Sequence, residues 1–175
     1  MDILKNEKFK EIMSYVLIIL VVILIRVFIF DPVRVDGPSM DTTLAQGQIL
    51  ILNKITYRRN DIKRFDIVVV KINNKKLIKR VIGLPNEKVD IKNNKFYING
   101  KELKENYGSS KADDYDFEEK MGMEKLPGNG YFVVGDNRAI SADSRYEEVG
   151  FIRREQVLGK VNLRIWPFTK FGKVK

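Results

Sequence analysis

A long apolar run near the N-terminus is the most continuous hydrophobic feature of the chain. It extends from Ile12 to Phe30, and no charged or strongly polar side chain interrupts it between Tyr15 and Ile25. The run is apolar on every side, whereas a helix that covers a soluble core shows one apolar stripe. As a helix it would be roughly 28 Å long, close to the thickness of the hydrocarbon core of a bilayer. The pattern therefore predicts a single N-terminal transmembrane helix over residues 12–30.

A cleavable signal peptide and a buried core helix are the two other interpretations of this run. A signal peptide needs small residues before its cut site, and residues 27–32 offer none. A core helix would keep its polar side chains together on one face. Arg26 is the only charge inside the run, and near its end the long side chain can extend to the interface. An uncleaved signal anchor fits these observations best.

The charges that flank the run predict its orientation. Residues 1–11 contain three lysines, whereas residues 31–46 contain only Arg34 among three aspartates. Positive flanks stay on the cytoplasmic side of a membrane. We therefore expect residues 1–11 in the cytoplasm, residues 12–30 in the cell membrane as a single-pass anchor, and residues 31–175 outside the cytoplasm.

Beyond the anchor, the hydrophobic pattern changes to the short period of β-strands. Turn signals such as Asn73-Asn74, Asn93-Asn94 and Asn99-Gly100 separate the strand-like segments. The fold class is therefore predicted as mainly β, with two small sheets or a partly closed barrel, and residues 101–126 are expected to be a mobile insertion. The expected strands are rich in β-branched and aromatic residues and span 48–53, 66–72, 76–84, 88–92, 95–99, 131–135 and 157–166.

Composition narrows the possible chemistry. The chain has a formal net charge of +9, but its basic residues are scattered and form no arginine-rich or aromatic-interleaved motif, so we expect no nucleic-acid partner. It contains no histidine and no cysteine, which removes the usual metal ligands and the usual base of a serine nucleophile. An acidic block at residues 113–119 is interpreted as a solvated loop.

Without histidine, a nucleophilic serine needs a lysine or a carboxylate as its base. Ser39 lies in Gly37-Pro38-Ser39-Met40, nine residues beyond the apolar run. Lys79 lies between Leu77-Ile78 and Val81-Ile82, so as part of a strand it can project into apolar surroundings. Burial there would lower its pKa and make it a competent base. On composition alone, Lys79 could equally be an ordinary surface lysine.

A third polar segment runs from Gly135 to Arg145. It contains acidic and basic residues at two-residue spacing, Asp136 with Arg138 and Asp143 with Arg145, which predicts a loop stiffened by local ion pairs. Ser141 lies between the two pairs, and its hydroxyl could orient a neutral lysine amine. A polar turn with surface salt bridges is the alternative interpretation.

Taken together, these segments resemble the bacterial type I signal peptidases, in the short single-anchor form of Gram-positive organisms. The resemblance implies a β-rich catalytic domain with Ser39 as nucleophile and Lys79 as general base. It also implies that Ser141 helps to orient the lysine, that the charged residues form structural ion pairs, and that no metal or cofactor is needed. The motifs that carry it, in chain order, are the anchor, Gly37 to Met40 with Thr43-Leu44, Arg64 to Val70, Lys79 to Pro85, and Gly135 to Arg145.

The surroundings of Ser39 depart from the family pattern. The family usually has proline where this chain has Thr42, and another residue type where it has Pro38. Pro38 has no N–H group, so it cannot stabilise an oxyanion. Gly37 stands where some relatives carry a stabilising hydroxyl. The backbone N–H of Ser39 is therefore the expected first oxyanion donor, and the second is left unassigned.

The resemblance implies that the substrates are signal peptides of exported preproteins, which present small residues to two pockets before the cut. We expect the substrate to bind as an extended strand at a sheet edge. Each apolar candidate for the pockets could instead belong to the core. The candidates are Val33, Val35, Met40, Leu44, Leu77 and Ile78.

The lipid bilayer is the second expected partner. Trp166, Pro167, Phe168 and Phe171 lie among lysines near the C-terminus and suit an interfacial aromatic contact. A packed terminal strand would explain these residues equally well. The oligomeric state is left open.

Two other functions remain as alternatives. A self-cleaving repressor uses a similar serine and lysine, but it would need an internal Ala-Gly site and a DNA-binding domain, which this sequence lacks. A membrane-anchored preprotein-binding module, or a catalytically inactive homologue, would hold preproteins without cutting them. The presence of both Ser39 and Lys79 argues against inactivity.

Overall fold

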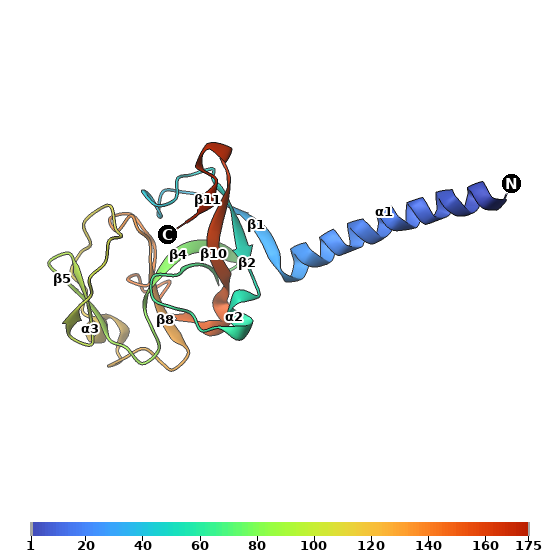
Figure 1. The fold of residues 1–175 in the computed structure, drawn as a ribbon. Helices are drawn as coiled ribbons and strands as arrows, with labels where there is room; N and C mark the ends of the chain where they lie inside the picture. The colour runs from blue at the N-terminus through green and yellow to red at the C-terminus, as the bar shows by residue number, and fades with distance from the viewer. Residues whose placement is uncertain (1, 175) are drawn as a thin grey trace.

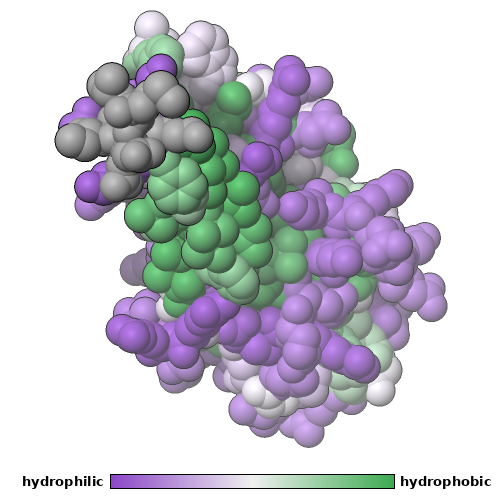
Figure 2. All heavy atoms as spheres, turned by 90° about the vertical axis from the view of Figure 1, so that its right-hand side faces the viewer, coloured by the Kyte–Doolittle hydropathy of each residue, from purple (hydrophilic) through white to green (hydrophobic). Residues whose placement is uncertain are grey.

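The computed structural model describes residues 2–174, with side chains from residue 7 onward, as one long helix attached to a β-rich domain (Figure 1). The helix, α1, spans Asp2–Phe28, and its part from Glu7 to Phe28 is long and apolar enough to cross a membrane. None of that part is buried against the domain. Figure 2, viewed from the side to which the helix extends, shows it as an apolar surface in front of a mostly hydrophilic domain.

The boundaries of α1 differ from the sequence prediction at both ends. The helix begins well before residue 12 and ends at Phe28, two residues earlier than expected. Phe30 instead begins strand β1, which spans Phe30–Arg34. Pro32 explains the early end, because a proline disfavours helical conformation in the residue before it and provides no N–H group for a helix. Only Ile29 separates the helix from the first strand.

An antiparallel sheet of eight strands forms the main part of the domain. Its spatial order is β1-β2-β10-β3-β4-β8-β9, and β11 pairs with β10. Besides β1, the strands are β2 (Ile49–Asn53), β3 (Ile67–Ile72), β4 (Lys75–Gly83), β8 (Gly130–Val134), β9 (Ile152–Arg153), β10 (Val157–Trp166) and β11 (Gly172–Lys173).

A smaller sheet and four short helices complete the fold. The sheet contains β5 (Val89–Lys92), β6 (Lys95–Ile98) and β7 (Lys101–Glu102). The helices are α2 (Thr56–Arg59), α3 (Phe117–Met121), η1 (Arg154–Gln156) and η2 (Phe168–Lys170). The prediction of a mainly β domain behind an N-terminal helix is confirmed, with two sheets.

The asparagine turns explain how the hairpins close. Asn73 and Asn74 have φ angles of 46° and 65°, and Asn93 and Asn94 have φ angles of 50° and 64°. Two successive residues at positive φ match the right-handed twist of antiparallel strands, and asparagine tolerates this conformation well. The first turn joins β3 to β4 and so sets the register of the strand that carries Lys79, and the second joins β5 to β6.

Residues 101–126 pack against both sheets. Tyr115 forms a bridge with Ile91, and Phe117 is fully buried, with its backbone N–H donating to Asp90 Oδ1 over 3.0 Å. Asp116 caps α3 by accepting a hydrogen bond from the N–H of Glu119. The mobility of this segment stays a prediction, while its contacts make it part of the core.

Candidate active site

Ser39 and Lys79 come from segments forty residues apart and meet in a direct hydrogen bond. Ser39 lies in a turn after β1, where Gly37 adopts a φ of 87° that favours glycine. Met40 and Leu44 are buried and hold this turn against the sheet. Lys79 lies on β4, and its Nζ donates to Ser39 Oγ over 2.8 Å.

Lys79 is buried, with only 3% of its surface exposed. Burial lowers the pKa of Lys79 to about 8, because the protonated amine loses its hydration. The charge of Asp143 raises this pKa, that of Arg145 lowers it, and that of Asp136 raises it, so the nearby charges partly oppose one another. A pKa near 8 leaves an appreciable fraction of the amine neutral at physiological pH, as a general base requires.

The loop of residues 135–145, which we call the Gly135 loop, packs directly against the turn that carries Ser39. The N–H of Asn137 donates to the carbonyl oxygen of Ser39 over 3.0 Å. A Cβ atom on Gly135 would lie 2.3 Å from the same carbonyl oxygen and 2.2 Å from Ser141 Oγ. Only glycine therefore fits at position 135, and its absent side chain allows the loop and the turn to touch.

One of the two expected local ion pairs is confirmed and the other is wrong. Asp143 pairs with Arg145, with Nε–Oδ1 and Nη2–Oδ2 distances of 2.8 and 2.9 Å. Asp136 pairs with Arg80 on β4 instead of with Arg138, at 2.8 and 2.7 Å, and both partners are almost fully buried. Sequence spacing missed this pair because its members lie 56 residues apart, with Arg80 inside β4 and Asp136 just beyond β8.

Arg138 finds its partner in a segment that the sequence did not connect with the site. Its guanidinium forms a two-pronged ion pair with Glu105, at 2.8 and 3.0 Å. Residues 105–110 continue across the site, and we call them the strap. The strap lies inside the region that was predicted to be a mobile insertion.

The strap contacts both the Ser39 turn and the Gly135 loop. The ring of Tyr107 stacks on the guanidinium of Arg80, with 3.5 Å between the ring centroid and Cζ. Ser109 Oγ donates to the carbonyl of Asp41 over 2.7 Å, and its N–H donates to the carbonyl of Asp136 over 2.9 Å. Ser110 Oγ donates to Asn137 Oδ1 over 2.9 Å. No motif pointed to these residues.

Thr43 also belongs to this network. Its hydroxyl donates to Oδ2 of Asp136, the carboxylate that holds Arg80. The Thr43-Leu44 motif therefore has two separate roles: Thr43 joins the turn to the buried ion pair, and Leu44 anchors it in the core.

Ser141 is fully buried in the loop, and its Oγ has no hydrogen-bond partner among the residues that the structure describes. A buried hydroxyl without a partner is unusual and costs stability. The predicted contact between Ser141 and the lysine amine is not formed in this conformation.

A cleft of about 270 Å³ opens beside Ser39. Its walls are β1 with the following residues to Met40, and the beginning of β4. Because β1 is an edge strand, one side of it is open to pairing with an extended peptide. Five of the six predicted pocket residues line this cleft: Val33, Val35, Met40, Leu77 and Ile78.

Leu44 is the exception among the predicted pocket residues. It is fully buried in the core cluster that also contains Leu50, Leu52 and Val69, and it does not line the cleft. The backbone N–H of Leu44 donates to the carbonyl oxygen of Met40, and this turn holds the leucine side chain in the core.

The whole chain, compared with known protein families, matches the profile described as signal peptidase, peptidase S26, over residues 9–166. The chain belongs to this family. The match covers the helix, the Ser39 turn, β4 and the Gly135 loop, and so includes every predicted site residue. Membership of the S26 family confirms the predicted enzyme class of serine endopeptidase.

Individual relatives agree with the family assignment. The chain is 41% identical to a signal peptidase I of Bacillus caldolyticus over 162 residues, covering 87% of this chain and 88% of the relative. It is 33% identical to signal peptidase IB of Staphylococcus aureus over 187 aligned positions, covering 96% and 94% of the two chains. The crystal structure of a signal peptidase I from Enterococcus faecalis superposes with a TM-score of 0.52 at 36% identity, over 58% of this chain and 97% of that chain.

Proposed function

We propose that this member of the S26 family is a membrane-bound signal peptidase I that removes signal peptides from exported preproteins. Ser39 is the nucleophile and Lys79 is its general base. The observation that carries the proposal is the 2.8 Å contact between Lys79 Nζ and Ser39 Oγ, made by an amine whose pKa is lowered by burial.

The reaction follows from this geometry. When Lys79 loses its proton, the same contact lets the hydroxyl of Ser39 donate to the neutral amine. The amine takes this proton as Oγ bonds to the peptide carbonyl carbon, and then delivers it to the leaving nitrogen as the peptide bond breaks. Water, activated by the same amine, hydrolyses the acyl-enzyme. The backbone N–H of Ser39 is the proposed first oxyanion donor.

The open edge of β1 supports the proposed mode of substrate binding. An extended signal peptide would add a strand beside β1, with its carbonyl at the cleft end next to Ser39. Pro32 has no backbone N–H group, so at this position of β1 only the carbonyl oxygen can form a hydrogen bond with the bound peptide. The small cleft, walled by Val33, Val35 and Ile78, suits small side chains.

Two features support a membrane location with the domain outside the cytoplasm. The exposed apolar helix from Glu7 to Phe28 can span a bilayer, and its lysine-rich start favours a cytoplasmic N-terminus. Phe168 and Phe171 are 76% and 62% exposed, so the terminal aromatic group is not explained by packing within the domain. Such exposed aromatic residues favour an interfacial contact.

The decisive experiment measures cleavage of a preprotein in membranes by the wild type and by the Ser39→Ala and Lys79→Ala variants. We expect each variant to lose at least about a thousandfold in rate, because a nucleophile and its base act as a unit. Lys92→Ala is the control, since Lys92 is an exposed lysine outside the site. Full processing by either active-site variant would overturn the proposal, and would favour a binding module or an inactive homologue.

A further inference from the structure

The junction between α1 and the domain is built around cations. Lys54 Nζ donates to the carbonyls of Arg26 and Val27 over 3.2 and 3.1 Å, so it caps the C-terminal end of the helix. It also lies 3.7 Å from Asp31 Oδ2. Lys76 approaches the same carboxylate to 3.5 Å, and Arg26 lies 3.9 Å from Asp31 Oδ1. Asp31 is thus shared by three cations.

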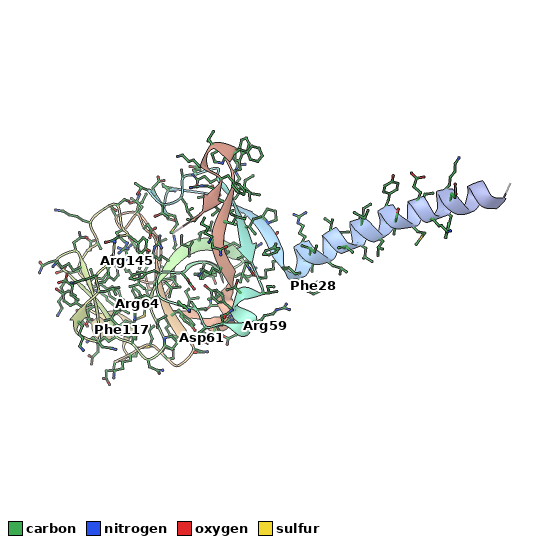
Figure 3. All side chains as sticks on the ribbon, in the orientation of Figure 1. Phe28, Arg59, Asp61, Arg64, Phe117 and Arg145 are labelled. Carbon is green, nitrogen blue, oxygen red and sulfur yellow. The ribbon has the colours of Figure 1, made fainter. Side chains whose placement is uncertain are left out.

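Positive charge exceeds negative charge around this junction. Arg58 and Lys71 join the group from α2 and β3, and among the described residues neither has a carboxylate at ion-pair distance. Asp31 and the partial negative charge of the helix end offset only part of the excess. Figure 3 places Arg59, a further cation of α2, on the side of the domain that faces the helix. The junction group consists of Arg26, Lys54, Arg58, Lys71 and Lys76.

Two adjoining grooves are lined by residues of the junction group. One, of about 610 Å³, lies among Lys54, Arg58 and Lys71, and the other, of about 450 Å³, is lined by Ile23 and Val27 of the helix. Both grooves share Asp31 and Lys54, so they form one continuous surface from the apolar side of the helix to the basic side of the domain. The surface therefore passes from apolar to cationic within the last turns of α1.

We propose that this surface binds the headgroup phosphate of an anionic phospholipid. The acyl and glycerol part of the lipid lies along Ile23 and Val27, and its phosphate lies among Lys54, Arg58 and Lys71. The inference rests on the proposed function in one respect, that α1 spans the bilayer and so brings this surface to headgroup level. A lipid is the occupant because the apolar groove continues directly into the cationic one.

The test uses the full-length protein in phosphatidylcholine vesicles that contain a trace of spin-labelled lipid. The fraction of label with restricted motion measures association with the protein, and labelled phosphatidylglycerol is compared with labelled phosphatidylcholine of the same chain length. The variant is Arg58→Gln/Lys71→Gln, which leaves the cleft and the Ser39–Lys79 pair intact. Lys92→Gln/Lys104→Gln is the matched control, with the same change of charge at exposed sites on and beyond the small sheet.

We expect the wild type and the control to prefer phosphatidylglycerol about tenfold, and the junction variant to lose most of that preference, since basic residues near a membrane surface attract anionic lipids. High salt should reduce the preference of the wild type in the same way. Equal association of both lipids with the wild type, or an unchanged preference in the junction variant, would overturn the proposal. Displacement of the lipid by an equal concentration of glycerol phosphate would assign the surface to free anions instead.

The lipid measurement also separates failure of this inference from failure of the proposed protease function. Ser39→Ala keeps the lipid preference if the inference is right, whether or not the protein is a protease. If α1 did not span the bilayer, the restricted fraction would be lost for both lipids at once. Thermal unfolding of the junction and control variants checks that each is folded.

Discussion

Lys79 is the residue at which activity and stability oppose each other. Its burial lowers the pKa to about 8 from the ordinary lysine value of 10.5, so the folded protein holds this proton less tightly than the unfolded chain does. Below about pH 8 the folded state must keep a charge away from water, and the cost is present in full. Between pH 8 and 10.5 this cost declines, and above that range it is gone.

The pH dependence of catalysis should report this residue. Because only the neutral amine can accept the proton of Ser39, kcat/KM should rise with pH and level off above an apparent pKa of about 8. Steady-state cleavage of a peptide substrate in detergent, from pH 6 to 10, measures it. A profile that rises only near pH 10 would mean that Lys79 is solvated in the working enzyme.

Replacing Lys79 by methionine should trade activity for stability. Methionine has a similar shape without the charge, so the variant should be inactive yet more stable at pH 7, by about 3 kcal/mol for a pKa lowered by two to three units. Urea unfolding at pH 7 and at pH 11 measures the difference. The gain should largely disappear at the higher pH, and a gain independent of pH would point to packing instead.

At the scale of elements, the strap is the segment that contacts all three parts of the site. Its contacts reach Arg80 on β4, the turn that carries Ser39, and the Gly135 loop through Ser109 and Ser110. Since these three parts are separate in sequence, the strap makes their positions depend on one another.

Replacement of Tyr107 tests this dependence. Tyr107→Ala removes the ring that covers the guanidinium of Arg80, and we expect a loss of about 1–2 kcal/mol in stability and about tenfold in kcat with little change in KM. Tyr107→Phe keeps the ring and should behave like the wild type. Equal losses in both variants would show that the hydroxyl matters instead of the stacking.

The strands were predictable because their signals are local. The strand that carries Lys79 contains two apolar pairs and follows the Asn73-Asn74 turn, and the observed β4 lies within one residue of its expected bounds. Strand β1 was missed because Asp31 and Pro32 interrupt the apolar pattern that it inherits from the helix. The helices α2 and α3 are too short to show a helical period.

The side-chain network was predictable only in part, for a related reason. Ser39 and Lys79 stand out by chemistry in a chain without histidine. The ion pair of Asp136 with Arg80 depends on how β4 and β8 align, and local spacing favoured Arg138 instead. The sequence gives no sign of the role of Tyr107, because a tyrosine in a polar segment does not indicate which distant side chain it will stack on.

At the scale of the whole molecule, the helix contacts the domain at its C-terminal end, through Lys54 and Asp31. The apolar part of α1 has no side chains buried against the domain. A protein that lacks residues 1–28 should therefore unfold at nearly the same temperature as the full chain, and should cleave a soluble peptide at a similar rate. A large drop in its unfolding temperature would show that the contacts of Lys54 and Asp31 with the end of the helix stabilise the domain.

The same truncated protein should process a preprotein embedded in vesicles about a hundredfold or more slowly. The anchor places enzyme and substrate in one bilayer, and that confinement raises their effective concentration. The initial rate with vesicles, compared with the rate on a soluble peptide, separates this effect from damage to the site.

The single residue between α1 and β1 has a geometrical consequence. Because β1 both continues the anchor and forms a wall of the cleft, Ser39 is held at one height above the membrane surface in the proposed arrangement. The anchor then fixes the distance between the bilayer and the site of cleavage. A peptide bond is cut when the hydrophobic stretch of its own chain, resting in the same bilayer, presents it at that height.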